Sequence, residues 1–185
     1  MTGEDRTRWN RRYSSGEYSL SKPPNSLLVQ WAPPGNGGLA LDLACGPGHN
    51  ALWLVHHGYR VLGVDISRVA LQEGIKAARA EGLAENICFV EADLDQFVIP
   101  PDCLDLIGVF RFLDRRLFPM LQAALRPGGL LIVETLNVAW REKHPGPPRH
   151  YLAELDELVQ LAAGMNILSN GMSEGLSHIV AQSKT

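Results

Sequence analysis

Short apolar runs alternate with amphipathic segments along most of the chain, and polar, glycine-rich connections separate them. Five apolar runs predict strands: residues 39–44, 60–64, 86–91, 104–110 and 130–135. Three segments between them carry apolar positions at helical spacing: 50–57, 67–80 and 115–126. Glycines stand where these helices would end: Gly58, Gly82 and Gly128. This regular alternation predicts a parallel sheet with helices on both faces.

The two ends of the chain depart from this alternation. Residues 1–37 are polar and aromatic, and Asn25-Ser26 marks a helix cap within them, so we expect a helical appendage ahead of an α/β core at 38–185. After a further amphipathic segment at 151–162, two strand candidates at 166–169 and 177–182 flank the turn-prone Asn170-Gly171. This late reversal predicts an antiparallel hairpin that closes one edge of the sheet.

The composition is that of one compact globular domain spanning 1–185. The 185 residues are 45% hydrophobic and 20% charged, and the formal net charge is -3. This balance gives no electrostatic case for nucleic acid, and four clustered arginines are interpreted as a solvated helix face: Arg6, Arg8, Arg11 and Arg12. The longest strongly apolar run, at 130–133, is far shorter than the roughly 20 residues that cross a bilayer. We therefore expect neither nucleic acid nor a membrane as a partner.

Three cysteines occur at spacings that match no metal or redox signature. With no apolar signal segment before them, they favour a reduced, cytoplasmic protein and no metal site. Cys45 and Cys88 are interpreted as small core residues, and Cys103 as a loop residue.

Gly46 and Gly48 directly follow the first predicted strand, where the backbone has to turn sharply toward a helix. Glycine there allows a positive φ and lets a ligand approach the main chain. The spacing Gly46-x-Gly48-x-x-Ala51 also fits the dinucleotide fingerprint, which is weak evidence when it stands alone. The residues around the turn therefore have to decide which cofactor is bound.

Three carboxylates fall on or at the ends of successive predicted strands, at Asp42, Asp65 and Asp93. Asp42 lies inside an apolar strand, where burial is costly unless a positive or hydrogen-bonding group meets it. A ligand ammonium could do so, although capping of the glycine turn is the alternative. Asp65 is placed to accept ribose hydroxyls and Asp93 an adenine amino group, with the Leu94 amide donating to the ring.

These residues resemble the first motif, D/E-x-x-x-G-x-G, of class I S-adenosylmethionine-dependent methyltransferases. Within that superfamily the chain is similar to the small tellurite-resistance and thiopurine-type branch. The segments that carry the resemblance are Trp9-x-x-Arg12-Tyr13, 41–46, His49-Asn50-Ala51, 64–67, 92–94, 126–129 and 134–136.

The resemblance implies a Rossmann-like, doubly wound, seven-stranded sheet, mostly parallel with the last strand antiparallel. It implies S-adenosylmethionine as the cofactor, with Trp9 and Tyr13 as a lid and Phe110 beside the sulfonium. Asp42 would lie near the methionine amino group. The implied cofactor contacts are Trp9, Arg12, Tyr13, Asp42, Ala44, Gly46, Gly48, Asn50, Asp65, Ile66, Asp93, Leu94 and Phe110.

Methyl transfer requires alignment of the acceptor and exclusion of water, so no catalytic base is obligatory. The sequence shows no base beside the fourth strand, which favours a small, soft nucleophile such as a thiol, selenite or tellurite. Arg111 is the candidate contact for an anionic acceptor, and Arg12, Arg149 and His150 could join it. The alternative is a residue at the sheet edge that pairs with Asp114 or with solvent. We expect residues 136–150 to cover the acceptor pocket.

Two other functions stay open at this point. A nicotinamide-dependent oxidoreductase could use the same glycine turn and Asp65, but neither Asp42 nor the late hairpin supports it. A non-catalytic binding module with a methyltransferase fold would have no need of the carboxylates at the strand ends.

Overall fold

The computed structural model describes residues 3–16, 22–144, 146 and 148–184 of the chain. These residues form two compact units, Met1–Val98 and Ile99–Thr185, which are described separately below. The expectation of a single domain with an N-terminal appendage stays a prediction.

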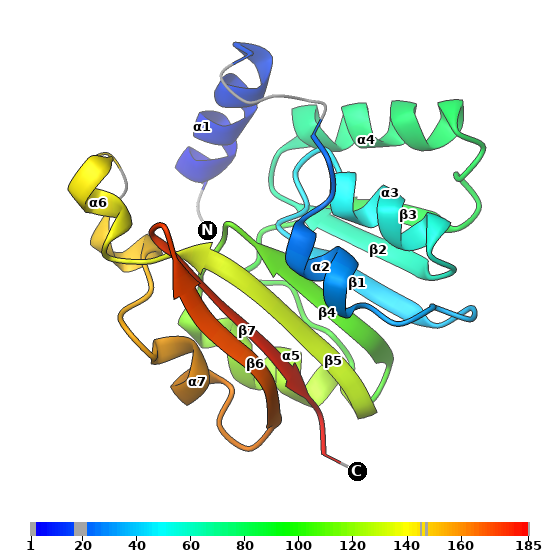
Figure 1. The fold of residues 1–185 in the computed structure, drawn as a ribbon. Coiled ribbons are helices and arrows are strands. Elements are labelled where there is room, and N and C mark those ends of the chain that lie inside the picture. Colours follow the sequence, from blue (N-terminus) through cyan, green and yellow to red (C-terminus); the bar gives the residue numbers. More distant parts are fainter. Residues whose placement is uncertain (1–2, 17–21, 145, 147, 185) are drawn as a thin grey trace. The chain divides into compact units, whose positions relative to one another are not determined.

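The first unit is built on three parallel strands in the order β3-β2-β1 (Figure 1). Their bounds are Leu39–Leu43 for β1, Arg60–Asp65 for β2 and Ile87–Glu91 for β3. Helix α3 (His49–His56) follows β1, and α4 (Arg68–Ala80) follows β2, capped by the Ser67 side chain. The two helices contact each other and the strands, so they cover the same face of this part of the sheet.

Two further helices precede β1. Helix α1 spans Gly3–Ser14 and α2 spans Ser26–Trp31. The predicted cap is confirmed, because the Asn25 side chain accepts a hydrogen bond from Leu27 N at 2.8 Å. The Asn25 amide in turn donates to Asn50 Oδ1 at 2.8 Å, which ties the start of α2 to α3.

The second unit contains the other four strands, with bounds Leu104–Phe110 (β4), Leu125–Leu136 (β5), Asn166–Ser173 (β6) and Leu176–Gln182 (β7). Its helical elements are η1 (Arg115–Leu117), α5 (Phe118–Ala124), α6 (Trp140–Lys143), η2 (Arg149–Tyr151) and α7 (Glu157–Leu161). Strands β4 and β5 are parallel, whereas β7 runs antiparallel to both β5 and β6. The strand order is β3-β2-β1-β4-β5-β7-β6, which confirms the predicted fold class.

Two helix predictions were wrong in extent. The helix predicted at 115–126 ends at Ala124, because β5 already begins at Leu125, which pairs with Leu104. The next pair is Leu106 with Leu130, so residues 126–129 bulge out of the strand, and Gly128 (φ 81°) serves this bulge instead of ending a helix. Within the segment 151–162, only Glu157–Leu161 is α-helical, as α7.

The hairpin was predicted correctly, but its turn was misplaced. The positive φ angles lie at Glu174 (50°) and Gly175 (82°), and Asn170 and Gly171 are part of β6. Gly171 pairs with His178 across the hairpin, and a Cβ on Gly171 would lie only 2.8 Å from His178 Cε1. The glycine therefore makes room for a side chain and does not form the turn.

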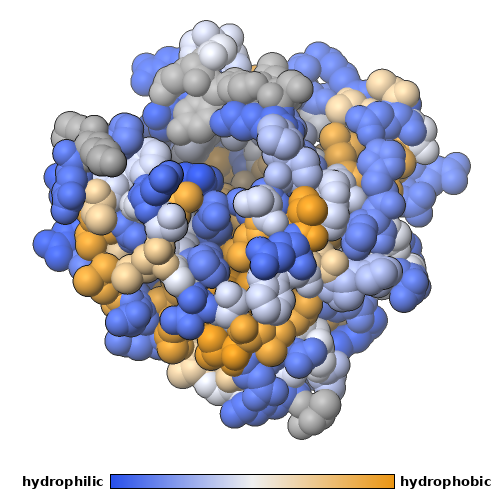
Figure 2. Space-filling view, in the orientation of Figure 1, coloured by the Kyte–Doolittle hydropathy of each residue, from blue (hydrophilic) through white to orange (hydrophobic). Residues whose placement is uncertain are grey.

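The described surface is mixed in polarity. Figure 2 shows hydrophilic residues over much of one face, with hydrophobic patches between them. Cys45 is buried as predicted, but Cys88 is exposed because β3 is an edge strand, so its assignment to the core was wrong. Within the described residues, no helix combines the length and apolar character needed to span a membrane.

Candidate functional site

The turn after β1 has a left-handed backbone. Ala44, Gly46 and Gly48 have φ angles of 56°, 54° and 80°. The turn is held to β2 by the hydrogen bond from Cys45 N to Val64 O, 3.0 Å long, and it closes on itself where Gly48 N donates to Cys45 O at 2.9 Å. Helix α3 begins directly afterwards, so the predicted strand, turn and helix are all present.

Packing inside the first unit leaves no room for a side chain at position 48. A Cβ on Gly48 would lie 2.6 Å from the Phe89 ring, and a Cβ on Gly63 or Gly74 would lie 2.8 Å from the same ring. The three glycines thus form a slot for Phe89. At Gly46, by contrast, a Cβ would meet the Tyr13 hydroxyl at 2.6 Å.

Asp65 organises the glycine turn from the end of β2. Its Oδ2 accepts from Gly46 N and its Oδ1 accepts from Ser67 N, both at 2.8 Å. Burial raises the pKa of Asp65, and these amide hydrogen bonds oppose the rise. The carboxylate oxygens have further lone pairs, so the same group can accept hydroxyls from a ligand.

Asp42 is a buried carboxyl beside the glycine turn. It is 1% exposed, and its Oδ2 has no hydrogen-bond partner among the described residues. Burial raises its pKa from an ordinary value of 3.8 to about 8, with Asp65 adding to the rise and the Ala51 amide opposing it. An unpartnered buried carboxyl of this kind fits a ligand that brings an ammonium group.

Other predicted cofactor contacts lie around this turn. Asp93 Oδ1 accepts from Asp95 N at 3.0 Å, and Ala92 N donates to Asp65 O at 3.0 Å, which joins the end of β3 to the end of β2. Leu94 and Ile66 are each 2% exposed. Burial and the neighbouring Asp42 and Asp65 carboxyls raise the pKa of the Cys45 thiol well above the ordinary value, which disfavours the reactive thiolate.

Helix α1 brings the predicted lid residues to the turn. The Tyr13 hydroxyl faces Gly46 as described above, and the Tyr13 and Trp9 ring centroids are 6.0 Å apart. The Arg12 guanidinium carbon lies 5.1 Å from the centre of the Trp9 ring. The structure thus groups Trp9, Arg12 and Tyr13 on the helix that covers Gly46.

The second unit carries Phe110 and Arg111 at the end of β4. Phe110 is 9% exposed, and Arg111 has a left-handed φ of 59°. The expected alternative partner of Arg111 was wrong: Asp114 pairs with Arg116 at 2.7 Å, whereas Arg111 Nε lies 3.5 Å from Glu134 Oε1. Arg111 N also donates to Glu134 O at 2.8 Å, so this arginine is held by one residue at two points.

Sequence reasoning missed Glu134 and His178. In the sheet register Glu134 lies opposite Phe110 on one side and opposite His178 on the other, so the three side chains share one face. Ser169 Oγ lies 3.3 Å from His178 Nε2, within hydrogen-bond distance. The alternation within 130–135 could have placed Glu134 on this face, but the pairing with His178 depends on the hairpin register.

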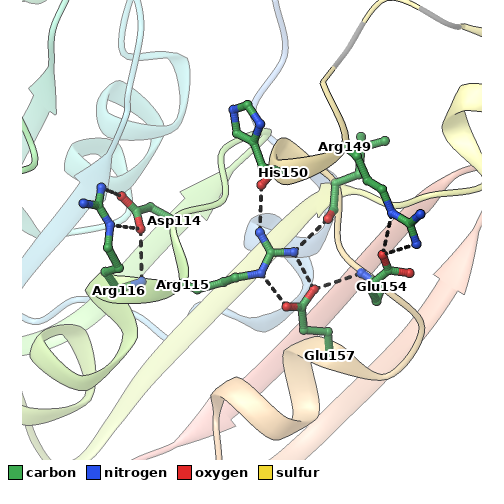
Figure 3. A network of polar contacts seen from close by, with 8 residues as sticks. Asp114, Arg115, Arg116, Arg149, His150, Glu154 and Glu157 are labelled. Atoms are coloured by element: carbon green, nitrogen blue, oxygen red, sulfur yellow. Dashed lines mark hydrogen bonds and ion pairs between the residues drawn. The ribbon is translucent and has the colours of Figure 1, made fainter. Parts of the chain in front are cut away.

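Arg115 holds residues 150–157, which follow β5, by several hydrogen bonds (Figure 3). Arg115 binds both carboxylate oxygens of Glu157, at 2.5 and 2.8 Å, and donates to the carbonyls of His150 at 2.7 Å and Leu152 at 2.9 Å. Arg149 pairs with Glu154 at 2.8 Å. No three His, Cys, Asp or Glu side chains of the described ranges come together in a way that could hold a metal ion.

Comparisons with known proteins agree with this geometry. Residues 40–129 match a family described as a methyltransferase domain. An S-adenosylmethionine-dependent methyltransferase from Mesorhizobium loti superposes with a TM-score of 0.68 at 20% identity, covering 84% of this chain and 95% of that one. The chain has the class I methyltransferase fold. The family match covers just under half of this chain and supports a methyltransferase domain in this segment.

A second solved structure with this methyltransferase fold holds a cofactor product. The geranyl diphosphate C-methyltransferase of Streptomyces coelicolor, in complex with Mg2+, geranyl diphosphate and S-adenosyl-L-homocysteine, has a TM-score of 0.75 at 12% identity. It covers 97% of this chain and 98% of that one.

The curated relatives align over different shares of the two chains. Hemagglutinin 1 of Eikenella corrodens is 34% identical over 75% of this chain and 47% of its own length. Ribosomal RNA small subunit methyltransferase C of Alcanivorax borkumensis is 30% identical over 52% and 32%. Probable thiol methyltransferase 2 of Arabidopsis thaliana is 27% identical over 87% and 74%. The chain thus spans less than half the length of the first two relatives, and because the second carries a ribosomal RNA activity in its name, the expectation of no nucleic acid stays a prediction.

Proposed function

We propose that the protein transfers a methyl group from S-adenosylmethionine to a small molecule. The observation that carries the proposal is Asp42, a buried carboxyl with an unpartnered oxygen directly before a left-handed glycine turn. An ammonium group in this position stabilises the ionised carboxylate, which burial otherwise disfavours. The adenosyl cofactor carries both an amino group for Asp42 and a ribose for Asp65.

The remaining residues are assigned by their place in the first unit. Asp93 and Leu94 hold the adenine, and Ile66 lies beside them. Ala44, Gly46 and Gly48 shape the backbone of the turn. Trp9, Arg12 and Tyr13 cover the cofactor. The Asn50 side chain holds the start of α2, because its Oδ1 accepts a hydrogen bond from the Asn25 amide. The bound cofactor supplies an activated methyl group, so these side chains mainly orient it and exclude water.

The acceptor site is assigned to Phe110, Arg111 and Glu134 in the second unit. Arg111 is 50% exposed at its side chain, and its Nε faces Glu134, which leaves the end of the guanidinium suited to an anion. A soft nucleophile such as a thiol, selenite or tellurite needs no assistance in losing a proton. The named thiol activity of the Arabidopsis relative supports this class as the first to test.

A hydroxyl or amine acceptor is the second candidate, and one observation favours it. His178 lies opposite Glu134 and beside Ser169, on the face that carries Phe110. An imidazole next to a carboxylate can take a proton from an acceptor during methyl transfer. This second candidate therefore depends on His178, whereas the first does not.

The test is transfer of labelled methyl from S-adenosylmethionine to two acceptor panels, one of thiols, selenite and tellurite and one of phenols and amines. Thiol-type transfer that survives His178→Gln supports the first class, and phenol or amine transfer that is lost in this variant supports the second. Asp65→Ala should abolish either. Binding of S-adenosylmethionine without transfer to any acceptor would instead favour a non-catalytic module.

A further inference from the structure

Helix α1 is fastened to the start of α4 through one side chain. Asn10 Oδ1 accepts from Ser67 Oγ at 2.8 Å and lies 3.3 Å from Val69 N. Ser67 is fully buried, and its own Oγ accepts from Ala70 N as the cap of α4. Asn10 therefore joins α1 to the buried start of α4, and the two helices are in contact in the first unit.

The same contact leads directly to the cofactor site. Ser67 N donates to Asp65 Oδ1, and Gly46 N donates to Asp65 Oδ2, each at 2.8 Å. A short chain of hydrogen bonds thus runs from Asn10 through Ser67 and Asp65 to Gly46. Tyr13, one helical turn after Asn10, places its hydroxyl against Gly46 at the other end of this chain.

The attachment follows one face of α1. Arg6, Asn10 and Tyr13 are spaced four and three residues apart, so they lie on the same side of the helix. Arg6 Nε lies 3.3 Å from Glu91 Oε1, at the end of β3, where Glu91 also pairs with Arg68. The Arg6 pair is partly exposed, with the Arg6 and Glu91 side chains 46% and 25% accessible, and such pairs are weak. Asn10 contacts the fully buried Ser67 and is the better shielded of the two polar contacts.

We propose that Asn10 is a positioning residue that latches α1 over the bound cofactor and slows its release. The inference rests on the proposed function. Asn10 acts through Ser67 and Tyr13 and not on the reacting atoms. Because Oδ1 serves two donors at once, a side chain without an acceptor oxygen would leave the Ser67 hydroxyl proton without its acceptor on α1.

The experiment measures the dissociation rate of S-adenosylhomocysteine from the full chain by stopped-flow tryptophan fluorescence. Asn10→Leu keeps the side-chain size but removes the acceptor, and we expect release about tenfold faster with a nearly unchanged association rate. Asn10→Asp keeps an acceptor oxygen and should behave like the wild type. Ser14→Ala truncates an exposed polar residue of the same helix and should leave the release rate unchanged.

A second measurement uses the wild type alone. The arginines of α1 make the helix a trypsin substrate, and S-adenosylhomocysteine should slow cleavage there if α1 closes over it. Unchanged release in Asn10→Leu, or no protection of α1 in the wild type that binds the compound, overturns the latch and leaves the proposed function standing. Failure of the wild type to bind S-adenosylhomocysteine overturns both.

Discussion

Gly74 lies in the middle of α4, where general rules favour its replacement. Exchanging glycine for alanine inside a helix usually stabilises a protein by up to about 1 kcal/mol. Here the opposite is expected. A Cβ on Gly74 would lie 2.8 Å from Phe89 Cζ and 2.9 Å from the Pro47 backbone oxygen, and contacts under 3 Å require something to move.

The magnitude follows from the two opposing effects. Overpacking costs about 1–3 kcal/mol, and we expect about 2–3 kcal/mol here because one of the two contacts is a backbone oxygen. Subtracting a gain in helix propensity of about 1 kcal/mol leaves a net loss of unfolding free energy of about 1–2 kcal/mol for Gly74→Ala, or a fall in Tm of about 2–8 °C for a chain of this size. Since Pro47 is part of the glycine turn, affinity for S-adenosylhomocysteine should fall as well.

Urea unfolding of Gly74→Ala, Phe89→Leu and the double variant gives the answer. Leucine lacks the outer ring atoms that meet the new methyl group, so the Gly74→Ala cost should be smaller in the Phe89→Leu background. A Gly146→Ala variant controls for glycine replacement as such, because a Cβ there meets nothing within 4 Å. A more stable Gly74→Ala protein would refute the packing argument.

Three further predictions concern single side chains. Unfolding free energy should decline between about pH 4 and about pH 8, because the Asp42 carboxyl ionises with its ordinary pKa of 3.8 when unfolded but near 8 when folded. Asp42→Asn should reduce this decline, and an equal decline in the variant would contradict the assignment. Arg115→Lys keeps the charge but loses the two-pronged contact with Glu157, so it should cost about 1 kcal/mol in urea unfolding after allowance for exposure; no loss would speak against the clamp. Gly171→Ala should cost about 1 kcal/mol and shift the NMR signals of the His178 ring, whereas unchanged signals would show that the ring is not in contact.

The sequence was most informative where local pattern and tertiary role coincide. The apolar runs that became β1, β2 and β4 are buried in the sheet, and burial on both faces leaves a nearly continuous hydrophobic signal. The glycine turn and the Asp42 and Asp65 positions were likewise readable, because left-handed backbone and buried charge each demand particular residue types.

Features that depend on non-local packing could not be predicted. Nothing near Gly171 in the sequence shows that it makes room for His178, so its Asn-Gly pair was interpreted as a turn. Cys88 lies in an apolar segment that is typical of a core strand, and only the strand order shows that β3 is at the edge of the sheet. Asn10 and Ser67 are 57 residues apart, and their contact follows no sequence periodicity.

The most direct test of the cofactor site is calorimetric titration with S-adenosylmethionine, S-adenosylhomocysteine and NADH, repeated on Asp65→Ala. We expect the two adenosyl compounds to bind to the wild type and NADH not to bind. The substitution should weaken binding, because it removes both the proposed ribose acceptor and the hydrogen bond that holds Gly46. Binding of NADH alone, or equal affinity of wild type and Asp65→Ala for S-adenosylhomocysteine, would contradict these expectations.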